Sequence, residues 1–155
     1  MSMWSLKLVG FAAAGVVGAS VLALPGALAL EKPGQIRITD TERQHSRVDV
    51  GPRGSSPGDV DIYRLVLYNR RIQAKPLGHA ELVCTTITGS TQNCNGTYFL
   101  PRGELVVSGV ISSRLIYILA VVGGTELYNN ARGTLTVISL HRVPARELLL
   151  FRLVV

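Results

Sequence analysis

The sequence predicts an all-β fold, an eight-stranded antiparallel β-barrel preceded by a signal peptide. Three observations predict it. Short runs rich in β-branched residues and leucine alternate with Gly, Pro and Asn turns at regular intervals, most clearly over residues 96–155. No stretch after the first 29 residues has a helical period. The 155 residues are 47% hydrophobic and 17% charged, which fits one folded domain and argues against a disordered chain.

The first 29 residues read as a secretory signal peptide. A single charge, Lys7, precedes an apolar run over 8–24, and Pro25-Gly26 and then Ala27-Leu28-Ala29 follow. This order of a charged start, an apolar run and a small-residue cleavage site is typical of export. We expect a secreted protein whose barrel domain is 30–155. The alternative is an uncleaved membrane anchor, because the run is close to the lower limit of ~17 residues for a span.

The first half of the domain predicts three strands. Residues 35–39 alternate polar and apolar side chains, as a strand does. Residues 40–59 are polar and rich in Gly, Pro and Ser, so we expect a long surface loop, which in a small domain is often functional. Strand 60–68 turns at 69–70, and 72–75 can continue the hairpin. Pro76 predicts a bulge or an edge before strand 82–87.

The second half predicts five more strands, each bounded by turn residues. They cover 96–100, 104–111, 115–122, 131–140 and 147–154, with turns at 101–103, 123–125 and 128–130. The total of eight is enough to close a small barrel.

The two cysteines, Cys84 and Cys94, flank a polar stretch over 85–93 that reads as a hairpin loop. An even number of cysteines in an exported chain favours a disulfide. A bridge of this size would stabilise the fold by roughly 2–3 kcal/mol. Free buried thiols and metal ligands are the alternatives, but no histidine lies nearby to complete a zinc site.

The charge of the chain bears on whether it binds nucleic acid. The formal net charge is +6, but the basic residues are scattered without interleaved aromatic residues, so we expect no nucleic-acid partner. Cleavage would leave no membrane segment.

Residues 115–122 and 148–155 are apolar at almost every position, whereas a strand of a monomeric barrel should be polar on its outer face. A second protomer is the simplest cover, so we expect a homo-oligomer, a dimer or a trimer.

Several segments resemble the allene oxide cyclase/dirigent-like barrel superfamily, and most closely its bacterial secreted branch. They are 40–54, 58–59, 77–85, 94–103 and above all 120–133, where Gly-Gly-Thr is followed by Tyr and then by Ala-Arg-Gly. The resemblance extends over almost all of 35–155. It implies an eight-stranded antiparallel barrel, often dimeric or trimeric, with an interior pocket for a small apolar or aromatic molecule.

The resemblance also implies a function. Dirigents steer the coupling of radicals made by another enzyme, plant allene oxide cyclases steer a ring closure, and bacterial relatives include [4+2] cyclases. We therefore expect a secreted barrel that binds or orients a small molecule without a cofactor. One alternative is an isomerase or cyclase acting on a lipid-, phenol- or polyketide-derived substrate. Another is a structural or interaction protein with a filled barrel.

Candidate site residues follow from the resemblance and from strand alternation. The plant cyclases use an acid on the first strand, which points here to Asp40 or Glu42, although the alignment can also place Thr39 there. His79 and Glu81 share one face of a strand and would form an acid/base pair if that face is inside; the solvent side is the alternative.

Four aromatic residues could line a pocket or pack in the wall: Tyr63, Tyr98, Tyr117 and Phe151. The motif residues are best explained as structural, for tight turns and crowded strands: Gly123, Gly124, Thr125, Ala131, Arg132 and Gly133. The spacing of the three histidines predicts no metal site.

Overall fold

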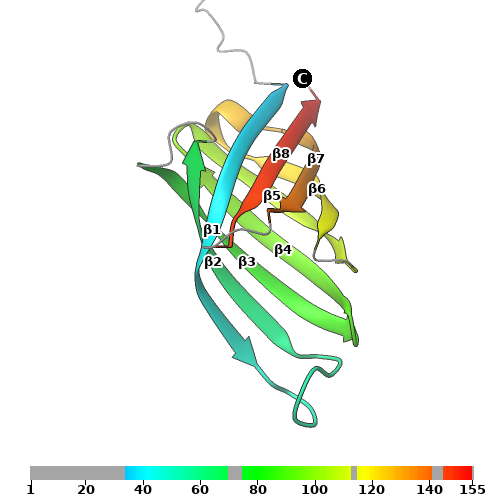
Figure 1. Ribbon diagram of the computed structural model, residues 1–155. Helices are drawn as coiled ribbons and strands as arrows, with labels where there is room; N and C mark the ends of the chain where they lie inside the picture. The colour runs from blue at the N-terminus through cyan, green and yellow to red at the C-terminus, as the bar shows by residue number, and fades with distance from the viewer. Residues whose placement is uncertain (1–33, 70–74, 113–114, 141–144, 155) are drawn as a thin grey trace, which may run out of the picture.

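The computed structural model describes residues 34–69, 75–112, 115–140 and 145–154, and the expected signal peptide lies outside these ranges. Eight antiparallel strands form a closed barrel in which each strand pairs with the next and β8 pairs with β1 (Figure 1). This confirms the predicted all-β barrel. The strands are β1 (Gln35–Val48), β2 (Val60–Asn69), β3 (Pro76–Thr88), β4 (Thr91–Leu100), β5 (Gly103–Ile111), β6 (Ile116–Gly124), β7 (Arg132–Ser139) and β8 (Glu147–Val154).

Alternate residues of each strand point into the barrel, and in one half of the interior they form a packed core. Tyr98 and Phe151 meet there edge to face, with ring centroids 5.2 Å apart. They are surrounded by inward leucines that are fully buried: Leu67, Leu105, Leu119, Leu135 and Leu149. This half of the barrel is filled by side chains.

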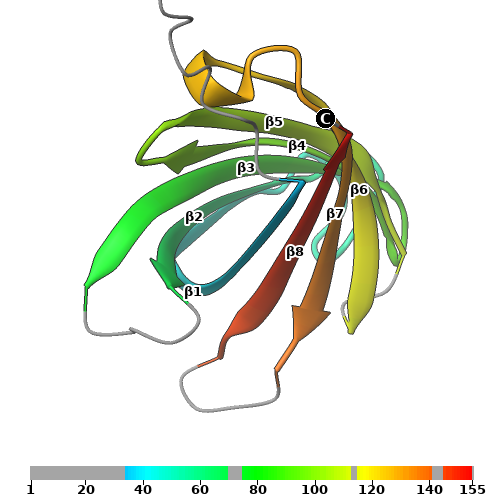
Figure 2. The ribbon, with the colours of Figure 1, turned by 90° about the horizontal axis from the view of Figure 1, so that it is seen from above.

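A one-turn 3₁₀ helix, η1 (Glu126–Tyr128), lies at the filled end of the barrel (Figure 2). It follows the Gly-Gly-Thr motif. A Cβ on Gly124 would lie 2.5 Å from the Tyr128 carbonyl oxygen, so only glycine allows this close approach. Thr125 joins the turn to β5, because its hydroxyl accepts a hydrogen bond from the Glu104 amide at 3.1 Å.

The second part of the motif, Ala131-Arg132-Gly133, lies at the same end of the barrel. Ala131 is fully buried, and its amide donates to the Tyr128 carbonyl at 2.8 Å. The Arg132 guanidinium donates to the Ala131 carbonyl at 2.9 Å. Gly133 has φ +148, and a Cβ there would lie 2.0 Å from the Arg152 carbonyl oxygen. These contacts account for the motif as a structural device.

The prediction of a loop over 40–59 is wrong for its first half. Strand β1 continues to Val48 and pairs with β2 along this length, with a bulge between Glu42 and Gln44. Only 49–59 connects the two strands. The strand lacks an apolar face here because its inward side chains, His45 and Arg47, pair with carboxylates instead of packing in the core.

The predicted hairpin loop over 85–93 is also mostly strand. Strand β3 continues to Thr88 and β4 begins at Thr91, so the turn is only Gly89-Ser90. Cys84 and Cys94 are direct cross-strand partners and form the predicted disulfide. Threonine is polar but β-branched, and it fits an extended strand as readily as a loop.

The bulge predicted at Pro76 is present. Pro76 is the first residue of β3, and the register between β2 and β3 shifts between Leu67 and Tyr68 opposite it. The expected continuation of the hairpin over 72–75 lies almost wholly outside the described residues. Within the described ranges, the structure contains no helix of sufficient length and hydrophobicity to span a bilayer.

Candidate functional site

The other half of the barrel interior contains a cavity of about 180 Å³. It lies at the end away from η1, between the last residues of β5 and β7, the first residues of β4, β6 and β8, and the central parts of β1, β2 and β3. Its wall is apolar where Leu65, Leu82 and Ile111 line it, beside the disulfide at Cys84. Its remaining lining residues include two tyrosines and a group of polar side chains: Tyr63, Tyr117, Asp40, Glu42, Gln92, Ser139, Arg146 and Glu147.

Asp40 is the most buried acid of this pocket, with 1% of its surface exposed. It pairs with Glu147 across β1 and β8, and its Oδ1 accepts a hydrogen bond from the Glu147 amide at 3.3 Å. Burial, together with the neighbouring charge of Glu147, raises the pKa of Asp40 to about 8. At neutral pH Asp40 is therefore mainly a protonated acid that can donate a hydrogen bond.

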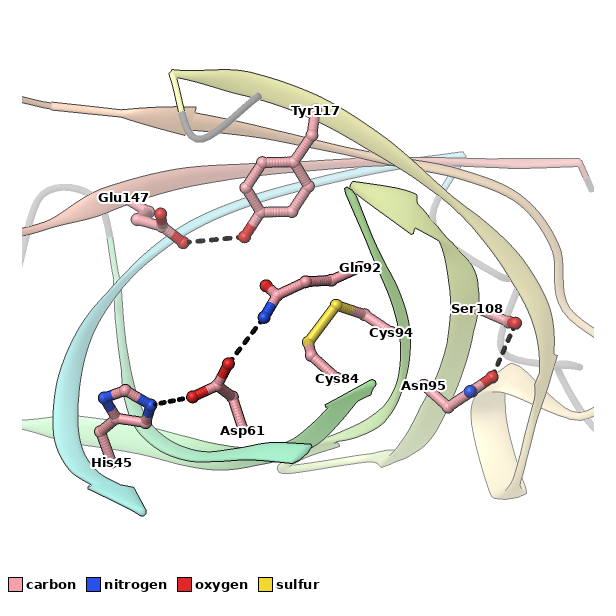
Figure 3. Close-up of a disulfide and its surroundings, with 9 residues drawn as sticks. All are labelled: His45, Asp61, Cys84, Gln92, Cys94, Asn95, Ser108, Tyr117 and Glu147. Atoms are coloured by element: carbon pink, nitrogen blue, oxygen red, sulfur yellow. Dashed lines mark hydrogen bonds and ion pairs between the residues drawn. A yellow bond between two sulfur atoms is a disulfide. The ribbon is translucent and has the colours of Figure 1, made fainter. Parts of the chain in front are cut away.

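Glu147 and Tyr117 form the next contact, with the tyrosine hydroxyl donating to Glu147 Oε2 at 3.2 Å (Figure 3). Burial raises the pKa of Glu147, and the hydrogen bond from Tyr117 opposes this shift. Burial and the nearby Glu147 carboxyl also raise the pKa of Tyr117, so its hydroxyl stays protonated. Together with Asp40, these groups form an acidic corner of the pocket, in which Asp40 is mainly protonated at neutral pH.

A second polar cluster lies across the interior from this corner (Figure 3). Asp61, with 1% of its surface exposed, accepts a hydrogen bond from Gln92 Nε2 at 2.6 Å and contacts His45 Nε2 at 2.8 Å. The His45 ring stacks on Tyr63 with centroids 4.5 Å apart. Because Gln92 and Tyr63 line the pocket, this cluster fixes the position of two wall residues.

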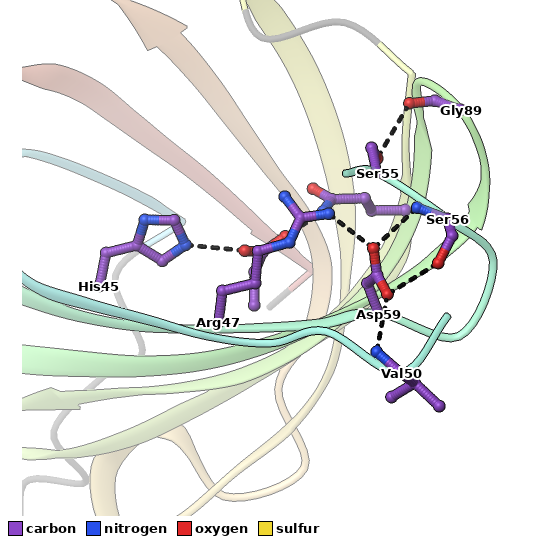
Figure 4. A network of polar contacts seen from close by, with 9 residues as sticks. His45, Arg47, Val50, Ser55, Ser56, Asp59 and Gly89 are labelled. Atoms are coloured by element: carbon purple, nitrogen blue, oxygen red, sulfur yellow. Dashed lines mark hydrogen bonds and ion pairs between the residues drawn. The ribbon is translucent and has the colours of Figure 1, made fainter. Parts of the chain in front are cut away.

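Asp59 anchors the β1–β2 connection next to this cluster (Figure 4). Its carboxylate accepts hydrogen bonds from the Ser56 amide at 2.7 Å, from Arg47 Nη2 at 2.7 Å and from the Val50 amide at 3.0 Å. The hydrogen bond from the Ser56 amide and then that from Arg47 hold the pKa of Asp59 well below its usual range. Asp59 is therefore an ionised structural anchor.

The structure brings some of the predicted residues together and separates others. Asp40, Glu42, Tyr63 and Tyr117 all line the pocket. Tyr98 and Phe151 do not, because both are packed in the filled half of the barrel. Thr39, the alternative first-strand position, is buried but does not line the pocket.

The possibility that His79 and Glu81 face the interior is wrong. They alternate with Ala80 and Leu82, which are the inward residues of β3. Glu81 pairs instead with Arg64 at 3.0 Å, and both side chains are about half exposed. His79 stacks on Phe99 with centroids 4.4 Å apart. The two residues belong to the outer surface of the barrel.

Sequence reasoning missed several lining residues, above all Glu147, Gln92 and Arg146. A signal for two of them existed. Glu147 is two residues before Leu149, and Gln92 is two residues before Cys94, so strand alternation places both on the inner face. Arg146 precedes its strand and had no such signal. Among the described residues, no group of three or more His, Cys, Asp or Glu side chains could hold a metal ion.

No protein-family model matches this chain, and no curated protein matches its sequence. Solved structures do match. A pyocyanin demethylase is 22% identical, with a TM-score of 0.67, over 77% of this chain and 99% of that chain. The Diels-Alderase AbmU from Streptomyces koyangensis is 14% identical, with a TM-score of 0.62, over 77% of this chain and 64% of that one. The pterocarpan synthase dirigent protein GePTS1 is 17% identical, with a TM-score of 0.59, over 77% and 84%.

These likenesses show the fold of this chain. The chain folds as a closed barrel similar to those of a dirigent protein and of a Diels-Alderase, and the sequence resemblance predicts such a barrel. At identities of 22% and below, they assign no activity to this chain.

Proposed function

We propose that this protein is an exported barrel that binds a small apolar or aromatic molecule in its interior pocket and orients it for stereoselective coupling or cyclisation. The observation that carries the proposal is the cavity of about 180 Å³, which joins an apolar wall to the acidic corner around Asp40. Apolar surface with a few placed polar groups is the usual composition of a small-molecule site. The cavity also argues against a barrel filled throughout by side chains.

Orientation needs a fixed polar contact as well as a shaped wall. The Asp40 carboxyl lines the pocket, and its Oδ2 atom has no hydrogen-bond partner among the described residues. A ligand oxygen that accepts from this group would be held in one place, with the ligand body against Leu65, Leu82 and Ile111. A pocket that holds one conformer of a reactive molecule can direct its reaction without a cofactor.

The second candidate function is an isomerase or cyclase that acts without a cofactor. The observation that favours it is the raised pKa of Asp40, about 8, because an acid that is protonated at neutral pH can act as a general acid. The solved structures of similar fold include a Diels-Alderase, which supports a cyclase. In this case Asp40→Asn would abolish turnover while ligand binding persists, whereas a purely orienting barrel would lose selectivity alone.

We also propose a homo-oligomer formed through the outer face of β6. Its outward side chains are apolar, and Ile116, Ile118 and Val122 are 57%, 59% and 42% exposed. Ile138 of β7 lies beside Ile116 on the same face. A contiguous apolar surface of this kind is typical of a protein interface, and a second copy of the chain is the simplest partner.

Native mass spectrometry of protein purified from its own host tests the binding proposal. We expect an additional small-molecule mass that denaturation releases. Ile111→Trp should remove this mass by filling the pocket, while Val83→Trp, on the outer face of β3 where Val83 is 46% exposed, should keep it. Protein without an additional mass, or Ile111→Trp protein that retains it, would contradict the proposal.

A further inference from the structure

Gln92, the second residue of β4, lines the cavity, and its side-chain amide is held in one orientation. Its Nε2 atom donates a hydrogen bond to Asp61 Oδ2 at 2.6 Å. The opposite orientation would place Gln92 Oε1 against the same carboxylate oxygen, and two acceptor oxygens in contact repel each other. The amide nitrogen of Gln92 is therefore committed to Asp61.

Asp61 acts as an acceptor on both of its oxygens. It lies on β2 with 1% of its surface exposed, and its Oδ1 atom contacts His45 Nε2 at 2.8 Å. The His45 ring is supported by its stack on Tyr63, with centroids 4.5 Å apart. Because each oxygen of Asp61 faces a donor, the carboxylate has no proton to offer Gln92 and holds the amide by its N–H side.

The carbonyl oxygen of Gln92 is left for the cavity. In Figure 3 this oxygen, Oε1, points away from Asp61, toward the side on which Tyr117 and Glu147 lie. It receives no hydrogen bond from any residue that the structure describes, and it is not sealed off by protein atoms. The Tyr117 hydroxyl does not serve it, because that group donates to Glu147 at 3.2 Å. The pocket thus presents a fixed acceptor that a ligand can reach.

The wall beside this acceptor is apolar. Ile111 is the cross-strand partner of Gln92 on β5, and both residues line the cavity, as does Tyr63. An apolar cavity of about 150 Å³ accommodates benzene, so the present cavity of about 180 Å³ has room for a slightly larger flat ring molecule. A ring that lies against Ile111 and Tyr63 would have its edge at Gln92.

We propose that Gln92 is a specificity-determining residue of the pocket and that Asp61 positions it, so that the pocket selects a ring ligand with an N–H or O–H donor. The inference rests on the proposed function and specifies its ligand class. The ligand donates to Gln92 Oε1 while its ring lies against the apolar wall. A ligand of the same shape without the donor would remove Oε1 from water and give no hydrogen bond in return, which is unfavourable.

Indole and benzofuran form a matched pair of probes, since they have the same shape and indole alone carries an N–H donor. Calorimetry with the full protein gives the ratio of the indole affinity to the benzofuran affinity. We expect Gln92→Leu to lower this ratio by about 3- to 10-fold, as the loss of one hydrogen bond predicts. The control Asn95→Leu should leave the ratio unchanged, because Asn95 is exposed on the outer face of the same strand, where it accepts from Ser108.

Asp61→Asn tests the positioning role. An asparagine can face Gln92 with either its oxygen or its amide group, so it no longer fixes the orientation of the Gln92 amide. We expect the ratio to fall part of the way toward its value in Gln92→Leu, while the affinity for benzofuran, which needs no acceptor, is retained. A merely structural role of Asp61 would lower the affinities for both probes alike.

Circular dichroism checks that each variant is folded. A ratio that is the same in wild-type and folded Gln92→Leu protein would overturn the inference and leave the pocket proposal standing. A ratio that folded Asp61→Asn protein keeps at the wild-type value would overturn the role of Asp61. If neither probe binds to the wild type, the inference is contradicted, and the presence or absence of a host-derived small molecule decides the proposed function separately.

Discussion

Asp40 couples the chemistry of the pocket to the stability of the fold. Its pKa rises from 3.8 to about 8 on folding, chiefly because the carboxyl is buried. Between these values the folded protein keeps a proton that the unfolded chain has released. The free energy of unfolding must therefore fall as the pH rises through this range, by up to about 1.4 kcal/mol per pH unit.

The variant Asp40→Asn tests this coupling. It replaces the acid by a neutral group of the same shape, so it should be more stable than the wild type at pH 7 and nearly equal at pH 3. Urea unfolding measured every pH unit from 3 to 8 gives both curves. The variant should also have the shallower pH dependence. Parallel curves for the two proteins would show that Asp40 is ionised in the folded state.

The residues that line the pocket were predictable from the sequence only where the family resemblance or the residue type pointed to them. Asp40 and Glu42 came from the resemblance, and Tyr63 and Tyr117 from the search for aromatic residues. The sequence left the side of His79 and Glu81 open, because spacing shows that two residues share a face of a strand, but not which face is inside. The buried Ala80 and Leu82 on the other face decide it. Arg146 was not predictable as a lining residue, because it precedes β8 and strand alternation does not apply to it.

Among the elements, the cross-strand disulfide joins β3 and β4 where Cys84 forms part of the pocket wall. The cysteines are 10 residues apart in the sequence. Closing a loop of this length restricts the unfolded chain, and we expect its loss to lower the free energy of unfolding by about 2–3 kcal/mol.

A double variant, Cys84→Ala with Cys94→Ala, measures this contribution by denaturant unfolding. The wild type in the presence of a reductant should approach the stability of the variant, and the reductant should leave the variant unchanged. Wild-type protein whose stability is the same with and without complete reduction would show that the bridge adds nothing to the fold.

The glycine motif at the filled end offers a matched comparison. Gly133 has a positive φ, and a Cβ there would meet the Arg152 carbonyl at 2.0 Å, whereas a Cβ on Gly123 would meet nothing within 4 Å. We expect Gly133→Ala to destabilise the barrel by at least about 2 kcal/mol, because it combines backbone strain with a clash against main chain.

Gly123→Ala should change the stability by less than about 1 kcal/mol. Thermal unfolding of the wild type and of both variants measures these changes in stability. Equal effects of the two substitutions would mean that the close approach of the Arg152 carbonyl to position 133 does not require glycine there.

The strands themselves were predicted well where one face is apolar and poorly where both are polar. Strands β5 to β8 alternate around buried leucines, and their expected ranges differ by only a few residues from those observed. The second half of β1 was taken for a loop because Arg47 points inward to Asp59. Hydrophobic periodicity does not detect a strand whose inner face forms ion pairs.

For the whole molecule, the barrel is closed, although β1 pairs with β8 only over Gln35–Asp40, and we expect assembly through the outer faces of its strands. The outer face of β6 is the strongest candidate because its residues are apolar on the side away from the core. The sequence predicted this from a run without polar positions, and the structure accounts for the run: Leu119 and Val121 fill the barrel while Ile116 and Ile118 face outward.

Ile118→Asp should therefore convert the protein to a monomer without unfolding it, because a buried charge at an interface is costly and an exposed one is not. Ile62→Asp is the matched control. Ile62 is 43% exposed and lies on β2, which is four strands away around the barrel. Sedimentation velocity of the wild type and both variants measures the oligomeric state. A monomeric wild type, or an oligomer that Ile118→Asp leaves intact and Ile62→Asp disrupts, would exclude the β6 face as the interface.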